Sequence, residues 1–461
     1  MSRPGAVTAT LALYLLALVV AGWAARRRAS ASAADYYLGG RSLGPWVAAL
    51  SASASSSSAW SLLGVSGAAF SLGGPAVWIL PGCLGGFAVN WFFVAPRLRR
   101  RAAATGALTL TDVLATDEGG RRSRAVAWTA SGLVLVSLGV YVAAQLQGAG
   151  GAFSQALGLD RRMATVAGAV VVLAYTVTGG FLAASWTDAL QAFVMAASAI
   201  VLPVVLVAAA GGPGAVIEAA SPFADPASGA ALAMLGIGLG YPGQPHVVNR
   251  FMAARDEAAI RTGRWISLGW AAILYTGMIA LGWAARAVHL APASDEDVLL
   301  ASATAHLPPV AAGVVVAAVL SAVMSTVDSQ LLVAGSAASH DLRGTDGRGR
   351  AGARRARYAV AAVAGTGLAL ALGVRATIFE RVLFAWDALG AAFGPALVWT
   401  LAGSHPGRTP VLVAMAVGAG AAIGTSLAGI GGATGRLVPY ALASVALAGA
   451  VAVGRRRGGR R

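Results

Sequence analysis

The stretch that decides the fold is Ser51-Ala52-Ser53-Ala54-Ser55-Ser56-Ser57-Ser58-Ala59-Trp60. It lies inside an apolar segment, residues 46–72, that is long enough to cross a lipid bilayer. An unpaired backbone group in hydrocarbon costs several kcal/mol, so a hydroxyl-rich, helix-weakening run is tolerated mainly where it faces protein or a water-filled cavity. Considered alone, the run is explained equally well as a small-residue stripe that lets two helices pack closely.

Composition places the chain in a membrane. Of its 461 residues, 57% are hydrophobic and only 11% are charged, whereas a soluble domain carries roughly 25% charged residues. The apolar runs are continuous and close to 20 residues long, which indicates helices and not a β-barrel. Cys83 is the single cysteine, so the chain forms no internal disulfide and a thiolate metal site is disfavoured.

The apolar runs predict thirteen membrane spans. We expect them near residues 6–25, 46–72, 75–95, 125–149, 163–180, 189–210, 229–249, 265–287, 310–336, 358–374, 383–402, 409–429 and 435–454. The first run has no small-residue cleavage site after a basic start and is expected to be retained, not removed as a signal peptide.

Arginine positions give the orientation of these spans. All 34 basic residues are arginines, and with thirteen spans 27 of them fall on one side of the membrane. They are Arg26–Arg28, Arg41, Arg97–Arg101, Arg121–Arg124, Arg250–Arg264, Arg343–Arg357, Arg408 and Arg455–Arg461. The positive-inside rule then predicts an external N-terminus and a cytoplasmic C-terminus. Because the arginines occur in short clusters between apolar runs, the net charge of +16 reflects topology and not nucleic-acid binding.

The sequence lacks the usual patterns of an enzyme or an ATP-driven pump. Its five histidines are scattered without HExxH spacing, and no Walker loop precedes a helix. No nucleophile–base–acid set is visible. A membrane sensor built on a transport module remains an alternative from another functional class.

A second span also contains a helix-breaking run. Residues 236–246 hold four glycines and two prolines, and proline removes backbone donors while glycine raises backbone freedom. Unwinding frees carbonyl oxygens and exposes half-helix ends at mid-membrane, where transporters bind ions and polar solutes. The alternative is a kinked helix whose free groups are satisfied by its neighbours.

The two breaks divide the chain into similar halves. Each break opens a group of five spans, within residues 46–210 and 229–402, and an odd number of spans reverses the second group in the membrane. This spacing predicts an inverted repeat with the binding site between the repeats. Residues 1–45, with the first span and a linker, and residues 403–461, with two spans and a basic tail, are then peripheral.

A third polar cluster lies in the ninth span, at residues 321–330. The adjacent hydroxyls of Ser325 and Thr326 are suitable ligands for a small hard cation such as sodium, although such pairs often bond back to their own helix. Asp328 lies in the same cluster and Asp387 in the eleventh span. An acid at membrane depth is a candidate functional residue by default.

Five motifs in this order resemble the sodium/solute symporter family, most closely its bacterial sodium/proline symporters. They are residues 35–44 (DYYLGGRSLG), 179–188 (GGFLAASWTD), 240–245 (GYPGQP), 324–326 (MST) and 390–395 (GAAFGP). The resemblance covers about residues 35–402. It implies an all-α, leucine-transporter-type fold and sodium-coupled uptake of a small organic solute across the plasma membrane, without an organic cofactor.

The resemblance also implies particular site residues. The sodium ligands are the carbonyls of Ala54, Ser57 and Ala322 and the hydroxyls of Ser325 and Thr326. The solute-lining residues are Ser58, Trp60, Tyr141, Ile237, Tyr241, Gln244 and Pro245. The ion pathway contains Arg41, Ser56, Asp188 and Asp328, with Asp188 on the sodium exit route.

Two positions depart from the pattern of the sodium/proline symporters. They carry an aspartate where this chain has Ser56, and a tryptophan where it has Ile237. The first difference leaves proton coupling open beside sodium coupling, with Asp328 or Asp387 as a substitute charge. The second leaves a carboxylate or a vitamin open as the solute, beside proline or a related amino acid.

Overall fold

The computed structural model describes residues 3–26, 38–178, 181–223, 225, 227–342, 350–374, 376–403 and 405–458. Within these ranges the chain is helical, and its only β-type pairing consists of two isolated bridges. The first half contains α1 (Arg3–Arg26), η1 (Gly39–Arg41), α3 (Pro45–Ser56), η2 (Trp60–Gly64), α4 (Val65–Leu72), η3 (Gly74–Trp78), α5 (Ile79–Ala88), η4 (Val89–Val94), α6 (Ala95–Thr105), α7 (Leu110–Ala115), α8 (Arg124–Leu157), α9 (Arg161–Thr178) and α10 (Phe181–Ala209). The second half contains α11 (Pro213–Ala220), α12 (Gly229–Leu235), η5 (Gly236–Gly243), α13 (Pro245–Ala253), α14 (Glu257–Ala287), η6 (Asp295–Asp297), α15 (Val298–His306), α16 (Pro309–Ser336), η7 (Ala337–Asp341), α17 (Arg350–Gly373), α18 (Ile378–Ala402), α19 (Arg408–Leu427) and α20 (Gly432–Gly458).

The helices agree with the prediction of an integral, all-α membrane protein. In the described part of the chain, eight helices are long and apolar enough to cross a bilayer, and four shorter apolar helices accompany them. Each predicted span coincides with a helix or with a pair of half-helices. The number of thirteen membrane spans itself stays a prediction.

The serine-rich span is interrupted, as its sequence predicts. Helix α3 starts at Pro45, whose missing N–H is harmless in a first turn, and ends at Ser56. Ser57 then has an extended backbone, with φ −110° and ψ 92°. The chain resumes as a π-helical turn from Trp60 and continues into α4, which leaves the break within the buried part of the bundle.

The glycine- and proline-rich span is interrupted in a similar way. Helix α12 tightens into the 3-10 turns of η5, and Gln244 is extended, with φ −92° and ψ 102°. Pro245 then starts α13. The prediction of a broken helix is correct for both segments.

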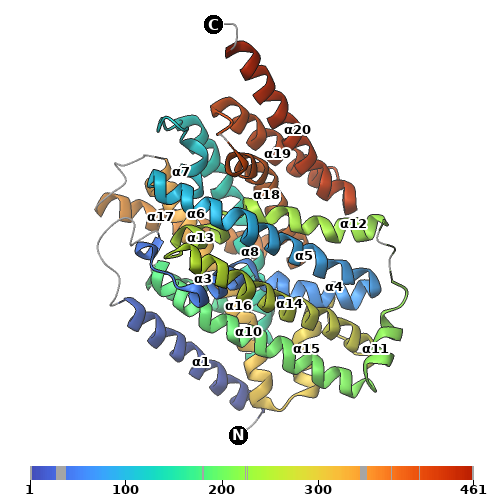
Figure 1. The fold of residues 1–461 in the computed structure, drawn as a ribbon. Coiled ribbons are helices and arrows are strands. Elements are labelled where there is room, and N and C mark those ends of the chain that lie inside the picture. The colour runs from blue at the N-terminus through green and yellow to red at the C-terminus, as the bar shows by residue number, and fades with distance from the viewer. Residues whose placement is uncertain are drawn as a thin grey trace.

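The two broken spans lie side by side. Leu43, just before α3, accepts from the amide of Arg255 at 3.0 Å and donates to the carbonyl of Ala253 at 3.2 Å, next to the end of α13. Helix α3 also contacts α10, α14 and α16. Figure 1 shows these elements grouped together, so residues distant in sequence meet around the two breaks.

The helices that flank the two groups lie at opposite edges of the bundle. Figure 1 shows α1 at one edge and α19 and α20 at the other. The Tyr14 hydroxyl of α1 lies 2.6 Å from Ser321 Oγ of α16, so α1 is anchored to the ninth predicted span. The limits of the two five-helix repeats stay a prediction.

Asp387 serves an interhelical contact. Its carboxylate lies 3.2 Å from the guanidinium of Arg436 on α20, and it accepts a hydrogen bond from Tyr440 at 3.1 Å. This pairing ties α18 to α20. Asp387 is thus already paired. Asp328, the other acid considered as a substitute charge, lies on α16 with the sodium-site hydroxyls.

Candidate ion and solute site

Oxygen atoms from α3 and α16 converge at the first break. The Ser325 hydroxyl is 3.1 Å from the Ala54 carbonyl and 3.3 Å from the Ala322 carbonyl. Thr326 Oγ1 lies 3.4 Å from the Ser55 carbonyl. All five residues are buried. Neutral hydroxyl and carbonyl oxygens without sulfur form a ligand set suited to a hard cation.

The serines at the end of α3 differ in what their hydroxyls do. Ser57 donates its amide to Ala54 at 3.2 Å, and its hydroxyl is buried without a hydrogen-bond partner among the described residues. Ser56 donates its hydroxyl to the Ser53 carbonyl at 2.9 Å. Ser56 is therefore engaged with its own helix, as serines in helices often are.

A chain of buried hydroxyls leads from this oxygen cluster to Asp188 of α10. Ser55 Oγ lies 2.8 Å from Ser329 Oγ and 3.3 Å from Asp188 Oδ2. Ser51 donates to the same carboxylate oxygen at 2.7 Å. The structure thus brings the predicted exit-path acid close to the predicted sodium ligands.

Arg250 of α13 neutralises Asp188. Their charged groups lie 3.1 Å apart. Arg250 also donates to Ser51 at 3.2 Å, to the carbonyl of His246 at 2.5 Å, and to Ser329. Arginine clustering had assigned Arg250 to a surface loop. The structure buries it instead, because a charge that is paired and hydrogen-bonded through all three guanidinium nitrogens can offset the cost of leaving water.

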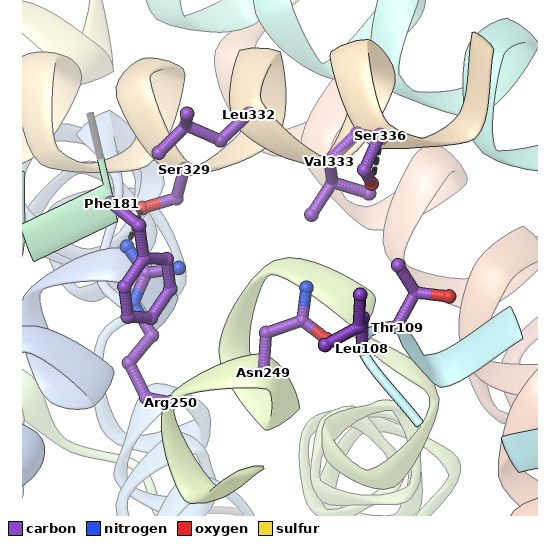
Figure 2. A pocket seen from close by; sticks show the side chains of 9 residues that line it. All are labelled: Leu108, Thr109, Phe181, Asn249, Arg250, Ser329, Leu332, Val333 and Ser336. Atoms are coloured by element: carbon purple, nitrogen blue, oxygen red, sulfur yellow. Dashed lines mark hydrogen bonds between the residues drawn. The ribbon is translucent and has the colours of Figure 1, made fainter. Parts of the chain in front are cut away.

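A small cavity adjoins this ion pair. Figure 2 shows Ser329, Val333 and Ser336 of α16 on one side and Asn249 and Arg250 of α13 on the other. The cavity volume is about 10 Å³, which is room for one water molecule. The side-chain amide oxygen of Asn249, Oδ1, is buried there without a hydrogen-bond partner in the described ranges.

Aromatic side chains surround the second break. The Tyr241 hydroxyl lies 3.0 Å from that of Tyr275, and its ring centroid is 4.7 Å from that of Trp386. Trp386 donates its indole N–H to the Ile237 carbonyl at 3.1 Å. A Cβ atom added to Gly240 would lie 2.0 Å from the same indole nitrogen. Glycine is therefore required for Trp386 to pack on η5.

Gln244 bridges the break to α18. Its side-chain amide donates to the carbonyls of Gly240 at 3.1 Å and Trp386 at 2.9 Å. The first bond gives a partner to a backbone oxygen of the interrupted segment, and the second joins that segment to α18. Pro245 follows directly and starts α13.

Trp60 closes the opposite side of this region. Its ring centroid lies 5.8 Å from Phe379 and 6.3 Å from Tyr275. The Phe379 amide donates to Glu296 of η6 at 2.8 Å. The loop containing η6 thereby holds the start of α18 over Trp60.

Tyr141 of α8 connects the two breaks. It interacts with Ser58 at the first break, and its ring lies 5.8 Å from that of His246 in a perpendicular arrangement. Gln145, one turn further along α8, accepts from the Ala59 amide at 2.9 Å. The predicted residues Ser58 and Tyr141 therefore lie together.

Several buried polar atoms around both breaks have no hydrogen-bond partner in the part of the chain that the structure describes. They are Ser57 Oγ, Trp60 Nε1, Gln145 Nε2, Gln244 Oε1, His246 Nδ1 and His246 Nε2. Most buried polar atoms in proteins are hydrogen-bonded. A concentration of unsatisfied donors and acceptors beside aromatic walls is typical of a site for a small polar solute.

The other two predicted pathway residues make different contacts. Arg41 donates to the carbonyls of Ala102 at 2.9 Å and Ala107 at 3.0 Å, so it fastens the segment before α3 to the end of α6. Asp328 is buried on α16 and interacts electrostatically with Arg250 and Tyr14.

Sequence reasoning missed several residues that the structure places at the site. They are Gln145, His246, Arg250, Tyr275 and Trp386. Of these, only His246 and Arg250 had a usable signal, because His246 ends the predicted break at residues 236–246 and Arg250 follows it by about one helical turn. The other three lie on continuous helices, and only helix packing shows which way their side chains face.

Comparison with known proteins agrees with the motifs. A model of the sodium:solute symporter family matches residues 36–418. The high-affinity proline transporter PutP of Bacillus subtilis (strain 168) is 34% identical, with 93% of this chain and 94% of that protein covered. The sodium/proline symporter of Escherichia coli (strain K12) is 36% identical, with 89% and 86% covered.

Solved structures show the same fold. A Na⁺-coupled sialic acid symporter in a substrate-bound outward-open state has a TM-score of 0.70 at 16% identity, over 97% of this chain and 98% of that chain. A nucleobase-cation-symport-1 family transporter in a closed conformation has a TM-score of 0.58 at 14% identity, over 90% and 94%. The prediction of a leucine-transporter-type fold is confirmed. The relatives are transporters, in agreement with the prediction that the chain is not an enzyme, and the chain belongs to the sodium:solute symporter family.

Proposed function

We propose that the protein couples the inward flow of sodium to the uptake of proline, or a closely related amino acid, across the plasma membrane by alternating access. The observation that carries the proposal is the position of the Ser325 hydroxyl between the carbonyls of Ala54 and Ala322. Three oxygens from two different helices meet there at the end of a broken helix. The names of the relatives support sodium as the ion and proline as the solute.

Sodium binds where α3 ends. The carbonyls of Ala54, Ser57 and Ala322 and the hydroxyls of Ser325 and Thr326 are the proposed ligands. A cation there also gains from the partial negative charge at the C-terminus of α3. Binding would fasten α3 to α16 and so favour one arrangement of the two helices over the other.

The solute binds between the two breaks. Tyr141, Tyr241 and Trp386 form aromatic walls for an apolar ring. Gln244 offers its unused side-chain amide oxygen to an ammonium group. Ser58 and Trp60 cover the side of the first break. Ile237 shapes the pocket through its carbonyl, which positions Trp386. Such a pocket, with apolar walls and a few placed polar atoms, fits a small amino acid.

Release occurs toward the side on which most arginines lie, which we place in the cytoplasm together with the C-terminus. An ion leaving Ser325 passes Ser55 and Ser329 and then meets Asp188. Asp188 can exchange Arg250 for the cation, so the ion pair closes the path until the cation arrives. Asp328 adds negative charge to the same route, Ser56 caps the last turn of α3, and Arg41 holds the segment before α3.

Uptake by purified protein in liposomes tests this function. Labelled proline should accumulate only with an inward sodium gradient, and excess unlabelled proline should abolish the signal. A panel of amino acids, small acids and vitamins as competitors identifies the solute if proline is wrong. Accumulation that ignores sodium and follows external acid would contradict sodium coupling and indicate proton coupling.

A further inference from the structure

A second buried network of charges lies just beyond the C-terminal end of α16, in and around η7. His340 in η7 places its Nε2 atom 2.8 Å from Oδ2 of Asp112 in α7. Arg122 donates to Oδ1 of the same carboxylate at 3.3 Å and to the Asp341 carbonyl at 2.9 Å. Thr109 donates its hydroxyl to Asp341 Oδ1 at 2.8 Å.

The network is a cluster of ion pairs in which both carboxylate oxygens of Asp112 already accept hydrogen bonds. Side-chain ligand atoms of Asp112, His340 and Asp341 lie within 4.8 Å of one another, a spacing that a metal ion also needs. However, Asp112 already accepts from Leu108, from Arg122 and from His340. A divalent cation would have to displace these donors, and Arg122 would repel it.

The same network forms one wall of the cavity beside Arg250. Thr109 lines that cavity, and its hydroxyl also accepts from the Asp112 amide at the start of α7. Ser336, one turn before His340 on the continuous helix of α16 and η7, lines the facing wall. Contact between His340 and Asp112 therefore holds the two walls together at the end of the release path.

The charges around His340 come from three elements. In the described side chains they are Asp112 of α7, Arg122 just before α8, and the neighbouring Asp341. Helix α17 also packs against η7, and its side chains are described from Tyr358 onward. Burial alone would raise the pKa of Asp112, but the hydrogen bond and charge of His340, with the Leu108 amide and Arg122, hold that pKa below its usual value.

We propose that His340 is a positioning residue for the release step: its imidazolium holds α7 against the end of α16, and loss of its proton loosens this wall. The inference rests on the proposed function and orientation, which place the network in contact with the cytoplasm. Because Asp112 stays ionised across the range in which an imidazole titrates, the ion pair is present at low cytoplasmic pH and loses its positive charge as the pH rises through the titration of His340.

Thiol labelling tests this proposal without requiring transport. The single natural cysteine, Cys83, is buried and is replaced by alanine, and Ser336→Cys then provides a reporter in the cavity wall. Inside-out membrane vesicles are treated with a membrane-impermeant maleimide between about pH 6 and 8.5, a range centred near the titration of histidine. Labelling of a small thiol in solution corrects for the ionisation of the reporter.

Two substitutions at one position give matched controls. Corrected labelling should rise about fivefold with pH in the parent, the Cys83→Ala and Ser336→Cys variant, which corresponds to about 1 kcal/mol. His340→Gln keeps a hydrogen-bonding side chain without the charge and should label fast at every pH. His340→Lys keeps the charge throughout this range and should label slowly at every pH.

The outcomes separate this proposal from the proposed function. A flat, corrected pH profile in the parent overturns the role of His340, and so does an unchanged rise in His340→Gln. The parent profile alone decides the matter if neither variant reaches the membrane. Sodium-driven proline uptake is measured on the same parent, so a failure of transport is distinguishable from a failure of the contact between His340 and Asp112.

Discussion

The carboxylate of Asp188 and the guanidinium of Arg250 lie 3.1 Å apart, with side chains that are 0% and 1% exposed. The pair joins α10 to α13, the half-helix that follows the second break. Ser55 of the first broken span contacts the same carboxylate. One buried ion pair thus links a continuous helix to both interrupted spans, on the route that we assign to release.

Removing one member of this pair should be costly, and removing both should cost less. Asp188→Asn or Arg250→Gln leaves a buried charge without its partner, a loss of about 3–5 kcal/mol of stability. The double variant should recover part of the unfolding temperature of the purified protein, but not transport. Arg100→Gln, which breaks an exposed pair with Glu257, should change the free energy of unfolding by less than about 1 kcal/mol. Additive losses in the double variant would contradict the pairing.

Substituting the sodium-site hydroxyls should change the sodium dependence of uptake, whereas substituting another hydroxyl of α16 should not. Combining Ser325→Ala with Thr326→Ala removes two proposed ligands and should abolish the sodium dependence of uptake while the protein still reaches the membrane. Ser321→Ala is the matched control, because its hydroxyl is also buried but bonds Tyr14 and Ala317. It should leave the sodium concentration for half-maximal uptake within about threefold of the unsubstituted protein's value, the effect of losing one ordinary hydrogen bond. Normal sodium stimulation in the double variant would rule out the proposed ligands.

Restoring an acid at the end of α3 should strengthen sodium binding. Ser56→Asp places a carboxylate beside the oxygen cluster and is expected to lower the sodium concentration for half-maximal uptake. Without sodium the same acid faces the negative end of the helix, at a cost of about 0.3–1 kcal/mol. The unfolding temperature should therefore depend more strongly on sodium than in the parent. Ser56→Asn controls for size, and equal sodium affinity in the aspartate and asparagine variants would refute the idea.

Gly240 should be essential for the shape of the solute pocket. In Gly240→Ala the new methyl group would collide with the indole of Trp386, which must then move away from Tyr241. We expect a rise in the KM for the solute of about tenfold or more, equivalent to about 1.4 kcal/mol of lost binding. Gly229→Ala is the control, since its methyl group meets open space. Similar KM values for the two variants would show that Trp386 does not shape the pocket.

The amino-acid sequence determined the class of the protein and the positions of its two breaks. Apolar runs, arginine clusters and local helix breakers are read along the chain, so the interruptions at Ser57 and Gln244 were predictable from serine, glycine and proline alone. The pair of hydroxyls at Ser325 and Thr326 was also visible locally. Their meeting with Ala54 followed only from the resemblance to the family, because neither hydropathy nor spacing relates α3 to α16.

Tertiary structure alone decided which charges are buried and which partners they have. Hydropathy assigns an arginine to a loop wherever an apolar run stops, and so it placed Arg250 at the surface. Only packing brings Asp188, 62 positions earlier in the chain, close enough to offset the cost of burying that charge. The same reason applies to His340 and Asp112, 228 positions apart. A sequence gives each residue's chemistry, whereas the folded helices determine which charge lies opposite it.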